Sequence, residues 1–446
     1  MSRRVKLLAV LFALATLRLV AATELAPTPP MGWNSWDSYG LTITEAEYKA
    51  NVTWFHDHLQ RLGWQYVVVD EGWYLHNPGG KGAAQGFIMD AAGRYQVADN
   101  RFPSAAESRG FKPLADWVHT QGLKFGLHII RGIPRDAVDR NLPIAESAFH
   151  ATEAANTADT CRWNSDNYGL RANAAAQAYY NSVMKLYAAW GVDYVKIDCI
   201  SKPYQADEIH MVSAAIAKSG RAMVLSLSPG PTPIDEAEDL QKYAQLWRIS
   251  DDMWDTWSAP EGATFPAGLA NQFERTAQWA PHAEAGHWPD ADMLPLGYLG
   301  PRPGWGEARA SRFTADESKM LMTLWSIARS PLVAGTNLTR MDPATTALYT
   351  NPEVIAVDQH SQNNRQLMRT ESLLVWTAES ETGEGHYIAI FNLGDAPQEA
   401  TFAWKDFGLT EKERGVRDLW ARKDLGKSDS LHARLPAHAA LLYRVR

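Results

Sequence analysis

Acidic residues stand directly after four short apolar runs of the sequence. They are Asp70 and Glu71, Asp198, Asp251 and Asp252, and Asp290 and Asp292. A single aspartate at the end of a strand is as readily a helix N-cap as a catalytic group. Four acidic clusters at four strand ends instead predict a site built from carboxylates, which is what cleavage of a glycosidic bond requires.

Asp198 and Asp252 are the predicted catalytic pair. Lys196 precedes Asp198 by two positions and projects to the same side of a strand, so its ammonium favours the ionised carboxylate of a nucleophile. Asp252 stands beside Asp251, and two crowded carboxylates favour the protonated form that a general acid needs. One ionised and one protonated carboxyl group are the two partners of glycoside hydrolysis.

Tryptophans accompany the same strand ends. Flat aromatic faces match the C–H faces of sugar rings, although core packing is the expected fate of about half of such residues. The tryptophans concerned are Trp33, Trp36, Trp73, Trp163, Trp247, Trp254, Trp257 and Trp288.

Short apolar runs alternate with longer amphipathic stretches over residues 23–350, which predicts parallel strand–helix units. The expected strands include 66–69, 125–128, 194–197 and 223–227, and the expected helices include 174–190 and 317–329. An open doubly wound sheet gives the same alternation, but it concentrates functional residues at one switch point. Because acids follow several strand ends here, the pattern favours an α/β fold of the (β/α)8 TIM-barrel type.

The pattern changes near residue 355. Short, partly alternating runs follow, separated by turn residues, at 373–376, 386–392, 399–404, 416–420 and 441–445. This spacing is typical of a small antiparallel β-sandwich, expected over residues 355–446.

Residues 1–22 resemble a signal peptide. Basic Arg3, Arg4 and Lys6 precede the apolar run Leu7–Leu17, and small residues end at Ala22, after which cleavage is expected. The apolar run is too short for a membrane anchor, so an exported protein, secreted or periplasmic, with no membrane segment in its mature form is predicted. The net charge of −8 and the lack of a dense basic stretch argue against nucleic acid as a partner.

Two cysteines, Cys161 and Cys199, are the only ones in the chain. They are either a disulfide, in an oxidising compartment, or two buried thiols, and the residues leave both open. No metal-binding motif or nucleophile elbow occurs in the sequence, so no metal site and no cofactor are expected.

At these residues the sequence resembles glycoside hydrolase family 27, the melibiase-type α-galactosidases. The matching segments are Pro30–Trp36, Val69–Trp73, Asp193–Asp198, Trp247–Asp252, Trp288–Met293 and Arg329–Leu332. They are long, ordered and distributed over the whole predicted barrel. The segment 131–163 resembles that of a bacterial branch of the family that also contains β-L-arabinopyranosidases.

The resemblance implies a retaining mechanism without metal or cofactor, with Asp198 as nucleophile and Asp252 as acid/base. It implies that Asp70 and Glu71 bind the 4- and 6-hydroxyl groups of galactose. It also implies that Lys196 binds further ring hydroxyls and that Arg248 contacts the 2-hydroxyl. The remaining substrate-binding positions of the prediction are Trp36, His128, Ser228 and Asp292.

Three positions depart from the family pattern. Glu71 stands where a second aspartate is usual, and its longer side chain reaches toward the space of galactose C6. Ser228-Pro229-Gly230 replaces the usual Cys-Glu-Trp, which removes a contact to the 2-hydroxyl. Cys199 follows the nucleophile by one position instead of two, which leaves the family's disulfide in question.

The sequence therefore predicts a retaining exo-glycosidase that hydrolyses terminal α-D-galactosides. A β-L-arabinopyranosidase is the alternative, since that sugar is galactose without the hydroxymethyl group that Glu71 would crowd. An inactive sugar-binding protein is less well supported, because a binder needs no nucleophile. Galactose-containing oligosaccharides or polysaccharides are the expected partners, and the sequence is compatible with a homo-oligomer.

Overall fold

The computed structural model describes residues 25–300, 307–383, 385–410 and 412–446. The predicted signal peptide, residues 1–22, lies outside these ranges. Within them, every helix is too short or too polar to cross a membrane.

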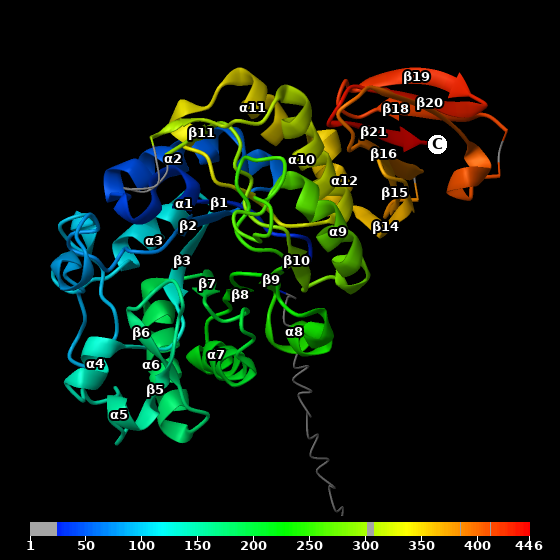
Figure 1. Cartoon of the computed structure of the whole chain (residues 1–446). Coiled ribbons are helices and arrows are strands. Elements are labelled where there is room, and N and C mark those ends of the chain that lie inside the picture. Colours follow the sequence, from blue (N-terminus) through cyan, green and yellow to red (C-terminus); the bar gives the residue numbers. More distant parts are fainter. Residues whose placement is uncertain (1–24, 301–306, 384, 411) are drawn as a thin grey trace, which may run out of the picture.

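Eight parallel strands form the sheet of a (β/α)8 barrel, as the apolar runs and the acids that follow them predicted (Figure 1). In spatial order they are β10 (Trp288–Asp290), β9 (Leu246–Arg248), β8 (Val224–Leu227), β7 (Tyr194–Asp198), β3 (Lys124–Ile130), β2 (Tyr66–Val69), β1 (Met31–Asn34) and β13 (Leu332–Ala334). The two outer strands are joined by the segment after β10, where the Leu294 amide donates to the Val333 carbonyl at 2.7 Å. The ring is closed in this way, and its carboxyl ends meet at one face.

Helices surround the strands and are begun and ended by the expected capping residues. The barrel helices are α2 (Glu45–His58), α3 (Lys112–Thr120), α6 (Ala174–Trp190), α7 (Ala206–Ser219), α8 (Ala237–Tyr243), α9 (Leu269–Trp279) and α10 (Ala315–Ala328). Thr44 and Thr314 each form a capping box with the glutamate three positions on. Asn173 caps the N-terminus of α6, and Gly191 ends it in the left-handed conformation.

Half of the eight tryptophans selected from the sequence belong to the core. Trp33, Trp73, Trp247 and Trp288 are buried among the barrel strands and helices, as the core alternative anticipated. The other four are at least partly exposed, and two of them, Trp36 and Trp163, reach the cavity described below.

An excursion of about 40 residues separates β3 from α6. It contains a small sheet of β4 (Ile133–Pro134), β6 (Asn167–Leu170) and β5 (Ala155–Thr160), with the short helices α4 (Arg135–Asp139) and α5 (Ala151–Ala154). Arg131 is buried at its base and forms ion pairs with Asp159 and Glu208. These pairs fix the excursion to α7, and with it the segment 161–166.

The C-terminal strands form two facing sheets, the β-sandwich that the sequence predicted. The larger sheet contains β14 (Ser361–Arg369), β15 (Leu373–Ser380), β16 (His386–Asn392), β21 (Ala439–Val445), β18 (Arg414–Asp418) and β19 (Lys423–Ser428), and the smaller contains β17 (Gln398–Ala403) and β20 (Ser430–Leu435). Ile388 and Ile390 of the first sheet share a core with Phe402 and Leu431 of the second. The predicted start at residue 355 falls within helix α12 (Pro352–Gln359), which follows α11 (Pro343–Tyr349), so the first strand begins at Ser361.

The sandwich lies against α10 and α12 on one side of the barrel (Figure 1), and Phe391 of β16 also packs edge-on against Phe273 of α9. Trp257 of the barrel stacks on His438 of the sandwich, with ring centroids 3.6 Å apart. His438 also contacts Glu317 of α10 at 3.2 Å. The loop 250–268, which follows β9 and contains Trp257, is therefore supported by the C-terminal β-sandwich.

Candidate active site

A cavity of about 470 Å³ opens at the carboxyl ends of the barrel strands. Eight of the ten predicted site residues line it: Trp36, Asp70, Glu71, His128, Lys196, Asp198, Ser228 and Asp252. The two predicted catalytic aspartates therefore share one cavity.

Asp198 ends β7 and is held in one position. Its Oδ1 accepts a hydrogen bond from the Cys199 amide at 2.6 Å, and its Oδ2 lies 3.7 Å from His128 Nε2 and 3.4 Å from Trp163 Nε1. Burial opposes ionisation of Asp198, but His128, Lys196 and the Cys199 amide together lower its pKa. Asp198 is accordingly an ionised carboxylate with one oxygen directed into the cavity, as a nucleophile must be.

Asp70 and Lys196 form the charged floor of the cavity. Asp70 Oδ2 accepts hydrogen bonds from Asn34 Nδ2 at 2.7 Å and from Lys196 Nζ at 3.1 Å. Burial works against the charge of Asp70, yet His128 and Lys196 bring its pKa well below the usual range. Burial works against the charge of Lys196 as well, but the carboxylates of Asp70, Asp198 and Asp292 together outweigh it and raise the pKa of Lys196. A fixed acceptor beside a fixed donor is suited to vicinal hydroxyl groups of a sugar.

Glu71 also lines the cavity and is oriented by a neighbour on the excursion. Asn164 Nδ2 donates to Glu71 Oε1 at 2.8 Å. Burial raises the pKa of Glu71 to about 7, and Asp198 and Asp166 add to the effect while His128 opposes it. Glu71 therefore changes its charge near neutral pH, in contrast to Asp70 at the adjacent position.

Asp252 lies in the loop after β9 and is more open to solvent than Asp198. Its Oδ1 accepts from Arg248 at 3.2 Å, and its side chain is 38% exposed, whereas that of Asp198 is 16% exposed. Asp251 is directed to Lys202, whose ammonium lies 2.8 Å from both of its carboxylate oxygens. The crowding of Asp251 and Asp252 inferred from the sequence is thus replaced by two separate ion pairs.

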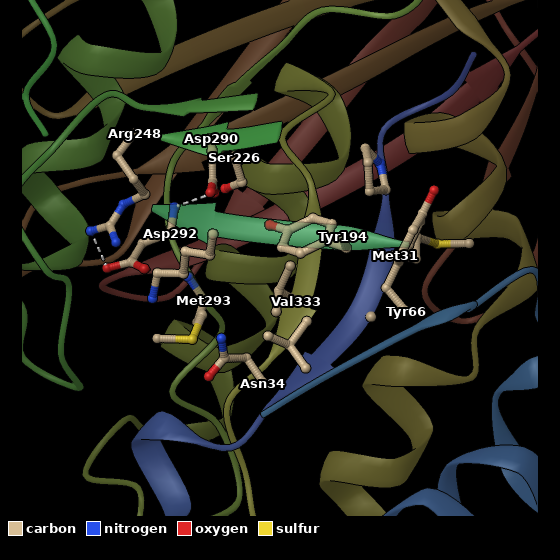
Figure 2. Close-up of a pocket in the computed structure, with 14 residues that line it drawn as sticks. Met31, Asn34, Tyr66, Tyr194, Ser226, Arg248, Asp290, Asp292, Met293 and Val333 are labelled. Atoms are coloured by element: carbon tan, nitrogen blue, oxygen red, sulfur yellow. Dashed lines mark hydrogen bonds and ion pairs between the residues drawn. The ribbon is translucent and has the colours of Figure 1, made fainter. Parts of the chain in front are cut away.

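Arg248 and Asp292 stand behind the cavity wall and do not line the cavity. They form an ion pair with an N–O distance of 2.5 Å. Figure 2 shows this pair at a second, smaller cavity inside the barrel, which Asn34, Ser226 and Asp290 also line. The Met253 amide donates to Asp292 Oδ2 at 2.7 Å. Burial raises the pKa of Asp292 while Arg248 opposes this. In this arrangement Arg248 orients Asp252, and Asp292 orients Arg248.

The segment 161–166 contributes Trp163, one of the tryptophans selected from the sequence, and Asn164, which the sequence reasoning missed. Cys161 is disulfide-bonded to Cys199, which resolves the alternative that the sequence left open. The bond places Trp163 beside Asp198 and Asn164 beside Glu71. Phe265, from the loop of Asp252, lines the cavity as well. Asn164 and Phe265 lie in loops outside the barrel strands, so the search for acids at strand ends carried no signal for them.

No group of three or more histidine, cysteine, aspartate or glutamate side chains with the geometry of a metal site occurs in the part of the chain that the structure describes. The cavity instead pairs an ionised aspartate with a second, solvent-accessible carboxyl group. Such a pair can form and hydrolyse a covalent glycosyl ester, since one group attacks while the other exchanges protons with leaving group and water.

The chain resembles known proteins over nearly its whole length. A family model described as alpha galactosidase A matches residues 167–360, and one described as alpha galactosidase C-terminal beta sandwich domain matches residues 370–445. The crystal structure of a family 27 β-L-arabinopyranosidase from Geobacillus stearothermophilus is 44% identical, covers 94% of this chain and 96% of its own, and superposes with a TM-score of 0.89. The chain belongs to glycoside hydrolase family 27.

More distant relatives match over nearly the full length. Alpha-galactosidase A of Cellvibrio japonicus is 26% identical over 95% of this chain and 93% of its own length. The alpha-galactosidase of Coffea arabica is 28% identical over 96% of each chain. The resemblance noted in the sequence is therefore confirmed for barrel and sandwich alike.

Proposed function

We propose that this family 27 member is a retaining exo-glycosidase that hydrolyses terminal α-D-galactosides, with Asp198 as nucleophile and Asp252 as general acid/base. The observation that carries the proposal is the shared cavity, in which an ionised Asp198 faces the same space as the more exposed Asp252. Related α-galactosidases of similar length support the choice of sugar.

In the proposed mechanism the galactose ring binds on the Asp70–Lys196 floor. Asp198 Oδ2 attacks the anomeric carbon while Asp252 donates a proton to the departing oxygen. Asp252, now a carboxylate, then takes a proton from water, which attacks the glycosyl ester and releases the sugar with its original configuration. His128 and Lys196 maintain the charge of Asp198 before the attack, and Arg248 keeps Asp252 in reach.

β-L-Arabinopyranosides are the second candidate substrates, and Glu71 is the observation that favours them. Asn164 holds the Glu71 carboxyl group at the cavity wall, where the extra methylene relative to aspartate takes up room near the sugar. The similar Geobacillus stearothermophilus enzyme is a β-L-arabinopyranosidase. The same catalytic pair serves both sugars, because they differ in the substituent at C5 and share the configuration of the ring hydroxyls.

The ratio of kcat/KM on p-nitrophenyl α-D-galactopyranoside and p-nitrophenyl β-L-arabinopyranoside tests the proposal. A galactoside preference supports the first candidate. An arabinoside preference supports the second, and Glu71→Asp should then shift the ratio toward galactose by about tenfold, the effect of relieving a clash of about one methylene. Turnover of neither sugar by folded protein would refute both.

We also propose that the chain is exported and cleaved after Ala22. The basic and apolar residues of the N-terminal segment support this, as does the disulfide between Cys161 and Cys199, which persists in an oxidising compartment. The mass of the protein recovered from the medium or the periplasm tests the cleavage site.

A further inference from the structure

The outer rim of the cavity carries two exposed aromatic side chains. Among the residues that the structure describes, five large apolar side chains are strongly exposed, and the two aromatic ones are Trp163, at 48%, and Phe265, at 47%. Both line the cavity that contains Asp198 and Asp252. Exposed aromatic rings at a binding cavity are costly to leave in water unless a ligand covers them.

The two rings belong to the two walls that carry the catalytic carboxylates. Trp163 lies on the nucleophile side, with its indole N–H 3.4 Å from Asp198 Oδ2. Phe265 lies on the side of Asp252, two positions before Ala267, whose amide donates to the Asp252 carbonyl at 2.8 Å. The rings therefore flank the space between the carboxylates and the solvent.

The position of the space between the two rings indicates which part of a substrate it can bind. The sugar that is cleaved off must reach the buried floor of Asp70 and Lys196, because those groups can bind its hydroxyls. The general acid protonates the oxygen of the leaving group, so the leaving group lies beside Asp252 and toward the solvent. An aromatic rim at that place suits the flat C–H face of a second sugar ring or an aryl aglycone.

Covalent and hydrogen-bonded contacts hold the Trp163 segment in place. The Cys161–Cys199 disulfide ties it to the residue after the nucleophile. At its other end, Asp166 accepts a hydrogen bond from Tyr74 at 3.2 Å, and the Arg135 amide donates to the Asp166 carbonyl at 3.0 Å. A ring fixed in this way binds a ligand with little loss of conformational entropy.

We infer that Trp163 and Phe265 form a leaving-group subsite that selects glycosides whose leaving group is a ring, a sugar or an aryl group, over those with a small alkyl leaving group. The inference rests on the proposed function, because the leaving group is located from the role of Asp252. Trp163 and Phe265 determine the specificity for the aglycone, whereas the cavity floor recognises the terminal sugar.

The test compares two substrates with the same terminal sugar and similarly basic alkoxide leaving groups: methyl α-D-galactopyranoside and α-D-galactosyl-(1→6)-D-glucose. The corresponding β-L-arabinopyranosides form the second pair. The measured quantity is the ratio of kcat/KM for the disaccharide to that for the methyl glycoside, in the wild type, Trp163→Ala, Trp163→Phe and Phe265→Ala. Ile234→Ala is the control, because Ile234 is a similarly exposed apolar side chain of the barrel that does not line the cavity.

We expect the ratio to fall by about tenfold in Trp163→Ala and about threefold to tenfold in Phe265→Ala, the usual effect of losing an aromatic stacking partner. Trp163→Phe should retain most of the ratio, and Ile234→Ala all of it. Inhibition by the free terminal sugar should remain unchanged in Phe265→Ala.

A ratio that stays at the wild-type value in both alanine variants would overturn the subsite. If kcat/KM then falls equally on the methyl glycoside and the disaccharide, the two aromatic residues have a structural role instead. Phe265→Ala keeps the test independent of any effect that Trp163→Ala has on Asp198. A wild type that cleaves neither pair would instead refute the proposed function, and the leaving-group assignment with it.

Discussion

The two walls of the cavity hold their carboxylates in different ways. The nucleophile wall carries Asp198 at the end of a barrel strand and is tied by the Cys161–Cys199 disulfide to the excursion. The acid wall carries Asp252 in a long loop, which is supported without covalent links by Arg248 and by the stack of Trp257 on His438. One wall is built for a fixed position and the other for access to protons.

This difference matches the two proposed tasks. A nucleophile stays ionised and must meet the anomeric carbon at one distance, so burial, a cationic neighbour and a rigid strand are useful to it. An acid/base group gains and loses a proton in each cycle, so contact with solvent is useful. The side-chain exposures of 16% for Asp198 and 38% for Asp252 follow that division.

Removing either catalytic carboxylate should have the largest effect on activity. We expect Asp198→Gly to lower kcat at least about 10⁴-fold on every substrate, because no other group in the cavity replaces the nucleophile. Asp252→Gly should lower it about 10²- to 10⁴-fold on disaccharides and much less on p-nitrophenyl glycosides, whose leaving group needs no proton. Steady-state kinetics on both substrate types measures this, and an equal dependence on leaving group in the two variants would contradict the assignment.

Cutting the disulfide should weaken the nucleophile wall selectively. The bond closes a loop of 38 residues in sequence separation, so Cys161→Ser should lower the free energy of unfolding by about 2–4 kcal/mol. Activity should fall as well, because Trp163 and Asn164 lose their attachment. Urea denaturation measures the loss of stability and kcat/KM measures the loss of activity. The wild type in dithiothreitol is the matched control. A variant as stable and active as the wild type would show that the non-covalent contacts of the excursion hold it without the disulfide.

Glu71, which Asn164 of the excursion contacts, should make the stability of the protein depend on pH. Burial raises its pKa to about 7, above the value of about 4.3 in an unfolded chain. The folded state thus binds this proton more tightly, and the resulting stabilisation is complete below about pH 4 and is lost as the pH rises through 7. Between pH 4 and 8 the wild type should lose about 1–3 kcal/mol relative to Glu71→Gln. Parallel stability profiles of the two proteins would contradict the raised pKa.

The support of the acid wall by the sandwich should have the smallest effect. His438→Ala removes the stack on Trp257 and the contacts to Glu317 and Asp395. We expect a loss of about 0.5–1.5 kcal/mol in stability and a decrease in kcat of a few-fold, with more effect on disaccharides than on aryl glycosides. Thermal unfolding and kinetics on both substrates measure it. An unchanged kcat on disaccharides would show that the loop of Asp252 is positioned by the barrel alone.

The positions of the acids at the strand ends were predictable from the sequence, but their side-chain partners were not. Apolar runs such as Tyr66–Val69 and Tyr194–Ile197 have the period and length of buried parallel strands, so the acids that follow them could be assigned to one face. The partners of those acids depend on side-chain directions that periodicity does not encode. Thus Asp251 pairs with Lys202 rather than crowding Asp252.

The excursion after β3 and the polar strands of the sandwich were the least predictable parts of the fold. The segment 161–166 belongs to an excursion whose small sheet has short strands and a register shift, and its role follows from one disulfide that the sequence left undecided. In the sandwich, β14 and β19 are largely polar and β20 is polar along one face, so none of the three contains an apolar run that the sequence could reveal. Tertiary contacts decide such elements, because local propensity alone is too weak.

Chemical rescue with azide tests the assignment of the two walls most directly. In Asp198→Gly, azide can occupy the space of the missing nucleophile and attack an activated α-glycoside, so we expect a glycosyl azide of inverted configuration. In Asp252→Gly, azide should attack the glycosyl ester on Asp198 and give a glycosyl azide of retained configuration. Proton NMR of the products distinguishes the two anomers. Retained product from Asp198→Gly, or inverted product from Asp252→Gly, would contradict the central claim that Asp198 is the nucleophile and Asp252 the acid/base.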